Sequence, residues 1–468
     1  MPRSFLLINA NVVRPPVSPI GLEYIGEYLV SSGVDVAILD LSWEARWQSA
    51  ISRAIERERP LAVGIGFRNL DDCSSASQTT FLAWLKQLVS AVKSRTESPV
   101  VLGGVGFSIA PKAILQETRA DFGIVGDGEE AIAALLLCLR QAGDYARVPN
   151  LLFWHGQEVR CTARADVDVS CLPTPRRRLF DNPRYQAEGG MVGVETKRGC
   201  PEKCIYCVDP LTKGDRLRFR SPQSVVSEIQ NLTDQRVYWF HICDSEFNIS
   251  PDHAKRVCRA LIDAGLGSRI HWYAYCAPLP FDEELARLMV TSGCAGLNFG
   301  VDSLCDAMLE QLGRRHRVSD IEGLVGILRR AGINFIFDLL LGGIGETEET
   351  LRISQEESRR LEIPLIGVAE GIRIYPGTAL WRRLSSAGQI ESTVSDLLDP
   401  RFYFSPALGK NPINCIRDII GDDSRYLLLD RDGQERNYNY VGDSRLCRAI
   451  AEGARGAYWD IIQRSRIE

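Results

Sequence analysis

The sequence predicts an α/β protein: a doubly wound parallel sheet, then a partial (β/α)6 barrel, then a mainly helical C-terminal region. Three observations predict this fold class. The chain has 468 residues, enough for about three domains. Strand and helix signals alternate through residues 1–145, and a second alternating series runs from residue 191 to about residue 380. We therefore expect domains at 1–145, 191–385 and 386–468, with a linker at 146–190.

The first alternating series consists of short apolar runs separated by segments with helical apolar spacing. Such a series is typical of a parallel sheet with helices on both faces, which binds ligands at the carboxyl ends of its strands. Glycine-rich turns at 103–106 and 126–128 follow two of the strands, although tight turns into helices are the alternative. We expect strands at 5–9, 34–39, 62–66, 100–102 and 122–125, and helices at 21–32, 80–94 and 129–141.

The second series follows an irregular stretch with a hairpin at 150–153 and 158–161 and a basic loop at 176–178. Six strands, each followed by helical sequence, fit an open barrel with its site at the strand ends. After Trp381 the periodicity weakens, and the chain ends in a helix at 443–467. The six strands are expected at 193–196, 237–242, 271–275, 296–299, 335–341 and 367–374.

Composition excludes several classes of protein. The 55 Lys and Arg residues against 60 Asp and Glu give a net charge of −5, so no basic surplus favours nucleic acid. No apolar stretch reaches the ~20 residues of a membrane span, and the N-terminus lacks the regions of a signal peptide. We expect a cytoplasmic protein whose 14 cysteines form no disulfide framework.

The most specific motif is a loop directly after a predicted strand. Cys200, Cys204 and Cys207 have the spacing C-x3-C-x2-C. Thiolates are the usual ligands of iron–sulfur clusters, and three on one short loop can hold three irons of a four-iron cluster. An amino acid's amine and carboxylate can then chelate the open iron. Three unrelated buried cysteines, or a zinc ion with a distant fourth ligand, are the alternatives.

This loop, with Tyr206 immediately before its last cysteine, resembles the cluster motif of the radical S-adenosylmethionine superfamily. The resemblance implies a [4Fe-4S] cluster on the three cysteines and the methionine part of S-adenosylmethionine on the open iron. It also implies cofactor contacts at later strand ends, for the amino group, the ribose and the adenine in turn. These contacts would come from Tyr206, Asp244, Glu246, Asp302, Gly342, Gly343, Gly345, Arg373 and Tyr375.

Some of these residues have plainer explanations. Asp302 could cap the following helix, and the glycines from Gly342 to Gly345 could only turn the chain. Glu246 is the candidate catalytic residue, with two alternative roles. Its carboxylate either holds the cofactor's amine or competes for the open iron, and the second role would favour polar methyl transfer over radical initiation.

The N-terminal domain resembles the Rossmann-like cobalamin-binding domain that precedes the barrel in one subfamily of these enzymes. The likeness lies in 19–22, 101–104 and 125–129, and it implies a corrin site. The loop at 64–72 resembles that of methylases of the tryptophan 2-C-methyltransferase type, where an arginine matching Arg68 faces the lower side of the corrin. The implied cobalamin contacts are Arg68, Asn69, Gly103, Gly104 and Gly126.

Two alternatives apply to this domain. Arg68 could form a surface ion pair with Asp71 or Asp72, or the domain could have lost its corrin. If cobalamin binds, the first domain supplies no imidazole ligand to cobalt, because it contains no histidine. The five histidines are His155, His241, His253, His271 and His316.

We therefore expect a cobalamin-dependent radical S-adenosylmethionine methyltransferase that acts on a small molecule in a biosynthetic pathway, most often at carbon. An external electron donor such as flavodoxin or ferredoxin is expected, and neither nucleic acid nor membrane. A peptide substrate and a phosphorus acceptor are alternatives, as are 3-amino-3-carboxypropyl transfer, rearrangement, and a non-catalytic iron–sulfur protein. The C-terminal region from Asp399 is expected to close the barrel, its aromatic clusters at 401–404 and 455–459 lying in the core or at the substrate pocket.

Overall fold

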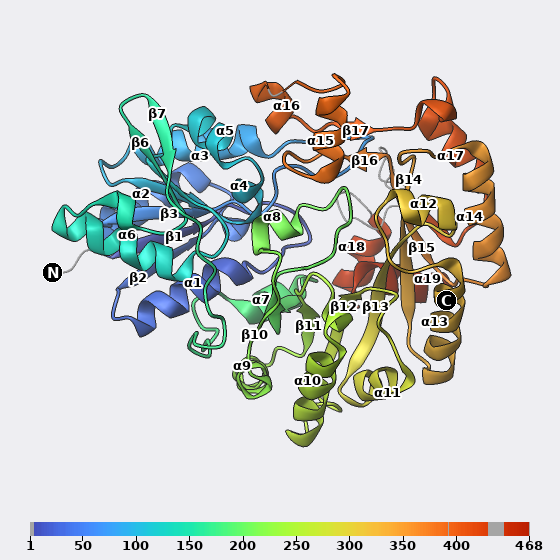
Figure 1. Cartoon of the computed structure of the whole chain (residues 1–468). Coiled ribbons are helices and arrows are strands. Elements are labelled where there is room, and N and C mark those ends of the chain that lie inside the picture. Colours follow the sequence, from blue (N-terminus) through green and yellow to red (C-terminus); the bar gives the residue numbers. More distant parts are fainter. Residues whose placement is uncertain (1–3, 392, 429–443, 468) are drawn as a thin grey trace.

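The computed structural model describes residues 4–391, 393–428 and 444–467. Two seven-stranded sheets organise the chain and lie side by side, as Figure 1 shows. The predicted α/β fold class is confirmed, with a doubly wound sheet first and a partial barrel after it. None of the helices in these ranges combines the length and the apolarity that crossing a membrane requires.

The first sheet has the strand order β2-β1-β3-β4-β5-β6-β7. Strand β1 is buried along its whole length, because helices α1 and α6 pack on one face of the sheet and α2, α3 and α5 on the other. The strands are β1 (Phe5–Asn9), β2 (Val36–Asp40), β3 (Ala62–Gly66), β4 (Val100–Gly103), β5 (Phe122–Ile124), β6 (Leu151–His155) and β7 (Glu158–Cys161). The helices are α1 (Ile20–Ser31), α2 (Trp47–Glu58), α3 (Leu82–Lys93), α4 (Val105–Ile109), α5 (Pro111–Thr118) and α6 (Glu129–Gln141).

The second sheet is parallel throughout and has the order β18-β15-β14-β13-β12-β11-β8. Its strands are β8 (Val192–Val194), β11 (Trp239–Ile242), β12 (His271–Cys276), β13 (Cys294–Asp302), β14 (Phe335–Leu341), β15 (Ile366–Glu370) and β18 (Tyr426–Leu428). Helices follow most of these strands: α9 (Pro222–Thr233), α10 (Pro251–Asp263), α11 (Glu283–Thr291), α12 (Asp306–Gln311), α13 (Val318–Ala331) and α14 (Glu348–Arg360).

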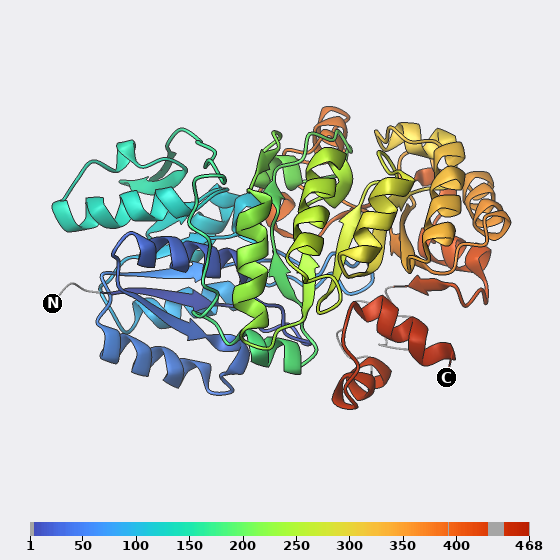
Figure 2. The same cartoon turned by 90° about the horizontal axis from the view of Figure 1, so that it is seen from below.

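The remaining elements are short or C-terminal. They are α7 (Asn182–Ala187), β9 (Lys197–Arg198), α8 (Asp209–Lys213), β10 (Arg218–Phe219), β16 (Ile372–Arg373), α15 (Ala379–Ser386), α16 (Val394–Leu398), β17 (Phe402–Tyr403), α17 (Pro412–Ile420), α18 (Ser444–Ala451) and α19 (Tyr458–Ile467). Figure 2 shows α18 and α19 on the barrel side of the molecule, away from the first sheet.

The structure differs from the expected elements in four main places. The barrel sheet has seven strands instead of six, because β18 of the C-terminal region pairs with β15. The hairpin expected in the linker joins the first sheet, because β6 pairs antiparallel with β5. The sixth barrel strand ends at Glu370 rather than at 374, since Gly371 has a φ of +78° and the chain turns there into β16. The expected final helix is two helices, α18 and α19, and its first residue, Asp443, lies outside the described residues.

A buried ion-pair network joins the two halves of the molecule. Arg177 lies between α1 and α9, and its Nε donates to Glu23 Oε2 (2.7 Å) while Nη1 donates to Glu228 Oε1 (2.5 Å). The side chains of all three residues are fully buried. Tyr24 also donates to Glu228 Oε1 (2.9 Å), so the network ties the first domain to the barrel's first helix.

Candidate active site

The three cysteines lie on a loop between β9 and α8, at the carboxyl edge of the barrel. Gly199 begins this loop with a φ of +89°, and a Cβ there would lie 2.0 Å from the carbonyl oxygen of Arg216. Only glycine fits, because both the backbone conformation and the space exclude a side chain. Backbone hydrogen bonds then fold the loop: Cys200 N donates to Gly214 O (3.0 Å) and Cys207 N to Cys204 O (3.2 Å).

A guanidinium and a carboxylate lie directly beside this loop. Arg314 Nη1 donates to Cys204 Sγ (2.9 Å), and its Nε lies 3.3 Å from Asp302 Oδ2. Tyr206 donates its hydroxyl hydrogen to the same oxygen (2.5 Å). Asp302 has a φ of +66° and follows a register shift in β13, which indicates a backbone held in a costly conformation at this site.

Glu246 lies next to this group with one oxygen unused. Its Oε1 is 3.9 Å from Arg314 Nη2, whereas its Oε2 is buried and has no hydrogen-bond partner. Burial, the largest cause, raises the pKa of this carboxyl to about 8. An orphaned carboxylate oxygen near three thiols on one loop fits a site that receives a cationic group, so the residues present fit a cluster with its amino-acid ligand.

The other residues predicted to contact S-adenosylmethionine have protein partners. Asp244 is buried, and its oxygens accept from Thr196 N (2.8 Å), Thr196 Oγ1 (2.6 Å) and Lys197 Nζ (3.1 Å). Gly342, with a φ of +97°, donates its N–H to Glu346 Oε2 (3.2 Å). The turn with Gly343 and Gly345 follows β14 as expected. The cofactor roles of all these residues stay predictions.

Arg373 and Tyr375 contact the first domain instead of facing the barrel alone. Arg373 Nη2 donates to Asp71 Oδ2 (2.7 Å) within a buried ion pair, and the Tyr375 hydroxyl is 2.9 Å from Cys73 Sγ. Asp71 and Cys73 belong to the loop after β3, which also carries Arg68. This loop therefore bridges the predicted corrin site and the predicted end of the S-adenosylmethionine site.

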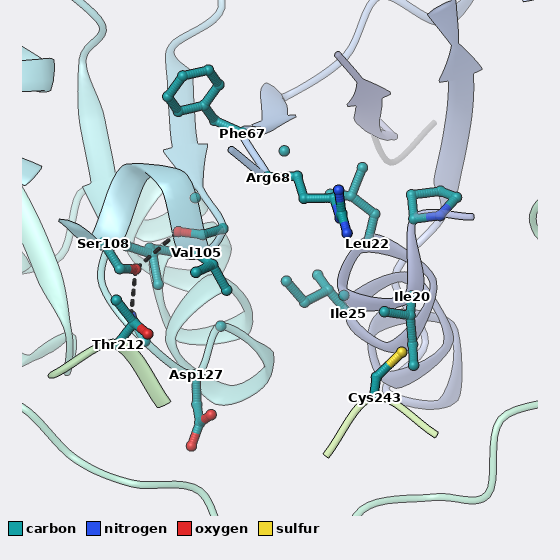
Figure 3. Close-up of a pocket in the computed structure, with 18 of the residues that line it drawn as sticks. Ile20, Leu22, Ile25, Phe67, Arg68, Val105, Ser108, Asp127, Thr212 and Cys243 are labelled. Carbon is teal, nitrogen blue, oxygen red and sulfur yellow. Dashed lines mark hydrogen bonds between the residues drawn. The ribbon is translucent and has the colours of Figure 1, made fainter. Parts of the chain in front are cut away.

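A cavity of about 530 Å³ opens between the first sheet and the barrel. One wall comes from the carboxyl ends of β1, β3, β4 and β5, and the opposite wall comes from the barrel strands β11 and β12 and from α8. All five residues predicted to contact cobalamin line it, namely Arg68, Asn69, Gly103, Gly104 and Gly126. Figure 3 shows Arg68 entering the cavity beside Leu22, with Cys243 of the barrel below it.

The first-domain wall is shaped by glycine backbone. Gly104 has a φ of +102°, and a Cβ there would lie 2.6 Å from Phe67 O. Ser108 joins two glycine turns, since its Oγ donates to Gly104 O (2.9 Å) and accepts from Gly126 N (3.0 Å) (Figure 3). This cradle of bare backbone beside an apolar cavity fits a large flat ligand such as a corrin.

The structure decides one alternative for Arg68. Asp71 pairs with Arg373, and Asp72 accepts from Ser77 Oγ (2.6 Å), so neither forms the surface ion pair considered for Arg68. Within the described residues Arg68 has no ion pair at all. Its guanidinium faces the cavity, and its positive charge lowers the pKa of His241 on the opposite wall.

Charged residues that sequence reasoning missed connect the two sites. Arg198, just before the cysteine loop, donates to Glu129 Oε1 (2.7 Å) and Asp127 Oδ1 (3.2 Å) on the first domain. Arg218 also donates to Asp127. Asp127 could have been singled out from the sequence, because it lies between two glycines of a predicted turn. Arg314 could not, because it is 110 residues from its partner Cys204 and belongs to no motif.

Comparison with known proteins agrees with this geometry. The chain matches the model of the radical SAM superfamily over residues 194–356 and that of the B12 binding domain over residues 6–136. It is 31% identical over 442 residues to the tryptophan 2-C-methyltransferase of Streptomyces laurentii, covering 81% of this chain and 74% of the relative. It is 23% identical to the hopanoid C-3 methylase of Methylococcus capsulatus, covering 78% of this chain and 68% of the relative.

Solved structures give the same result. The radical S-adenosylmethionine methyltransferase TsrM from Kitasatospora setae, solved with tryptophan and a cofactor analogue, has a TM-score of 0.91 at 27% identity and covers 99% of this chain and 98% of its own. A second TsrM structure, with cobalamin and a [4Fe-4S] cluster, has a TM-score of 0.88 at 26% identity and covers 100% of this chain and 99% of its own. The predicted cofactors and methyltransferase activity are confirmed. The chain belongs to the family of cobalamin-dependent radical S-adenosylmethionine methyltransferases.

Proposed function

We propose that this enzyme methylates a ring carbon of tryptophan or of a closely related indole in a biosynthetic pathway. One observation carries the proposal: a single cavity is lined both by the first-domain turns predicted to hold cobalamin and by the barrel residues His241 and Tyr275. The methyl carrier and the acceptor would therefore share one cavity. The names of the relatives support tryptophan as the first acceptor to test.

The bound cofactors would supply the chemistry: S-adenosylmethionine the methyl group, cobalamin its carrier, and the cluster an anchoring iron or an electron. The chain would hold and orient them. We propose that Cys200, Cys204 and Cys207 bind the cluster. Tyr206 and Asp302, with Arg314, then hold the edge of the S-adenosylmethionine site. Arg68, Asn69, Gly103, Gly104 and Gly126 would form the corrin cradle.

We assign Glu246 to the iron side of the site rather than to the cofactor's amine. Its unpartnered Oε2 and its position beside the cluster loop support this role. A carboxylate that competes for the open iron would hinder radical initiation. It would thereby favour polar methyl transfer to a nucleophilic ring such as indole.

We also propose a cytoplasmic setting, with flavodoxin or ferredoxin as the external reductant and no nucleic acid as partner. None of the 14 cysteines forms a disulfide in the structure, which supports a reducing compartment. The predicted boundaries at residues 145, 190 and 385 stay part of this proposal.

Anaerobic turnover with methyl-deuterated S-adenosylmethionine and tryptophan tests the function. We expect trideuteromethyl-tryptophan and an equal amount of S-adenosylhomocysteine, without stoichiometric 5′-deoxyadenosine. Stoichiometric 5′-deoxyadenosine alongside labelled product would contradict the polar route. Methylthioadenosine as the main fragment, with unlabelled product, would replace methyl transfer by aminocarboxypropyl transfer, and no reaction with tryptophan would remove it as the substrate.

A further inference from the structure

Two aromatic side chains form the barrel wall of the cavity. Along β11 the side chains alternate, so Phe240 and Ile242 are buried against the outer helices while His241 lies on the inner side. On β12, Tyr275 faces the same space, with 44% of its surface exposed. The two rings meet edge to face at 5.4 Å between centroids, and both residues line the cavity.

The neighbouring Cys243 lies within hydrogen-bonding distance of one ring nitrogen of His241. The Cys243 thiol donates to the carbonyl oxygen of His241 (3.5 Å), and its sulfur lies 3.8 Å from His241 Nδ1. A thiol has one hydrogen, so when that hydrogen is donated to the carbonyl oxygen the sulfur can only accept from Nδ1–H. Because a neutral imidazole carries one N–H, the lone pair is then on Nε2. Among the residues that the structure describes, none forms a hydrogen bond with Nε2.

The charges around His241 keep it neutral. Burial is the largest cause and Arg68 across the cavity the next, and together they lower the pKa of His241 to about 4; Lys213 acts in the same direction and Asp244 against it. Burial also raises the pKa of the Cys243 thiol to about 12, so the donor hydrogen stays in place. Near neutral pH the wall therefore offers an uncharged acceptor beside an exposed aromatic ring.

We propose that His241 Nε2 accepts a hydrogen bond from the ring N–H of a planar heteroaromatic substrate that packs against Tyr275. The geometry selects for an N–H donor over an isosteric ring without one, since an acceptor that the bound substrate covers and leaves unpaired is unfavourable. This inference rests on the proposed function and deepens it, because it names the substrate atom that is recognised. It makes His241 a specificity-determining residue.

Binding to the cluster- and cobalamin-loaded enzyme tests the inference without turnover. The probes are tryptophan and its analogue in which sulfur replaces the ring N–H, titrated calorimetrically. We expect the wild type to bind tryptophan about threefold to tenfold more tightly than the analogue, the range of one neutral hydrogen bond. In His241→Phe, which keeps a ring but removes the acceptor, this preference should fall to about one.

Two further variants make the test decisive. His155→Phe, on the exposed β6–β7 hairpin, makes the same substitution far from the cavity and should keep the wild-type preference. His241→Gln keeps an acceptor and should retain part of the preference if His241→Phe fails to fold or to keep its cofactors. An unchanged preference in His241→Phe or its absence in the wild type overturns the inference.

The two proposals can fail separately. Labelled methyl-tryptophan with no effect of His241→Phe on the preference leaves the function standing and removes His241 from recognition. If tryptophan is not methylated, indole and benzothiophene serve as the probe pair. A His241-dependent preference for indole would then support N–H recognition by His241 and refute tryptophan as the substrate. The absence of any preference would refute both proposals.

Discussion

Around the cluster loop, charged and aromatic side chains fill the space, whereas the first-domain wall of the neighbouring cavity is made of glycine backbone and apolar groups. Arg314, Asp302, Tyr206 and Cys204 contact one another within hydrogen-bonding distance. On the cavity wall, Gly104 and Gly126 allow close backbone packing, because a Cβ would lie 2.6 Å from Phe67 O at Gly104 and 3.1 Å from Arg164 Nη2 at Gly126. One site recognises its ligand by donor and acceptor chemistry, and the other by shape.

This difference explains why the two sites respond differently to substitution. A ligand held by side chains is lost when its donors are removed, while a ligand held by a cradle is lost when an atom is added. The buried network of Arg177 joins the first domain to the barrel. Removing Arg177 should therefore lower the folding stability of the whole protein. The four predictions below test these distinctions, from the largest effect to the smallest.

Removing the cluster thiols should break the first site completely. We expect the Cys200→Ala, Cys204→Ala, Cys207→Ala triple variant to keep less than about one tenth of the wild-type iron after anaerobic reconstitution and to have no methyltransferase activity, because thiolates are the cluster's protein ligands. Iron analysis and the visible sulfur-to-iron charge-transfer absorbance measure the cluster content. Cys161→Ala, on exposed β7, is the control. Four irons per chain in the triple variant would refute the assignment.

Breaking the junction should cost the most folding stability. Arg177→Met leaves Glu23 buried without its cation and leaves Glu228 with Arg220 alone, and breaking a buried ion pair in this way typically costs roughly 3–5 kcal/mol. Chemical denaturation measures the free energy of unfolding. Arg360→Met removes an exposed pair with Glu322 and should cost about 1 kcal/mol or less. Equal losses in the two variants would show that the network does not join the domains energetically.

Adding one methyl group should break the cradle. Gly104→Ala forces a Cβ toward Phe67 O in a backbone conformation that costs of order 1–3 kcal/mol for other residues, so cobalamin should bind about tenfold more weakly. Cobalamin retained per chain and its dissociation constant measure this. Gly156→Ala also has a positive φ, but its Cβ meets open space. Binding should survive there; a comparable loss would assign the effect to strain alone.

The smallest effect concerns the pH dependence of folding stability, through His241 on the barrel wall of the cavity. His241 has a folded pKa of about 4, below its unfolded value of 6.5, so its contribution to stability is present above pH 6.5 and is lost as the pH falls toward 4. Between pH 7.5 and 6 the wild type should lose roughly 0.8 kcal/mol more than His241→Phe. Urea unfolding of cofactor-free protein measures it. His155→Phe should behave as wild type. If stability falls with pH equally in His241→Phe and in the wild type, the imidazole of His241 is not held neutral by burial in the cavity wall.

Much of the fold could be predicted because buried parallel strands are continuous apolar runs. The expected bounds of β1, β3 and α6 coincide with the observed ones. Strand β18 could not be predicted, since three apolar residues in an irregular region give no period. The bend after Glu370 was missed because Ile372–Ile374 reads as a continuation of β15.

The residues of the candidate site also divide into those that the sequence could predict and those that it could not. The cysteine loop was visible because its residues are adjacent in sequence, and the corrin turns because glycine marks special backbone. Partners distant in sequence had no signal, as with Asp71 and Arg373, which are 302 residues apart. Inward-facing His241 and Tyr275 could have been found from the alternation of β11 and β12, because Trp, His and Tyr residues recur at every second position of these strands.

Strand β18 has a consequence for biosynthesis of the chain. It pairs with β15 and covers the hydrogen-bonding edge of the barrel sheet, although it comes from residues 426–428. Until that segment has left the ribosome, β15 presents an open edge to other nascent chains, and open edges template association. A chain cut before Tyr426 would thus retain every cluster ligand and every cradle glycine, yet be prone to aggregate. The last tenth of the polypeptide protects a sheet that the earlier part has already built.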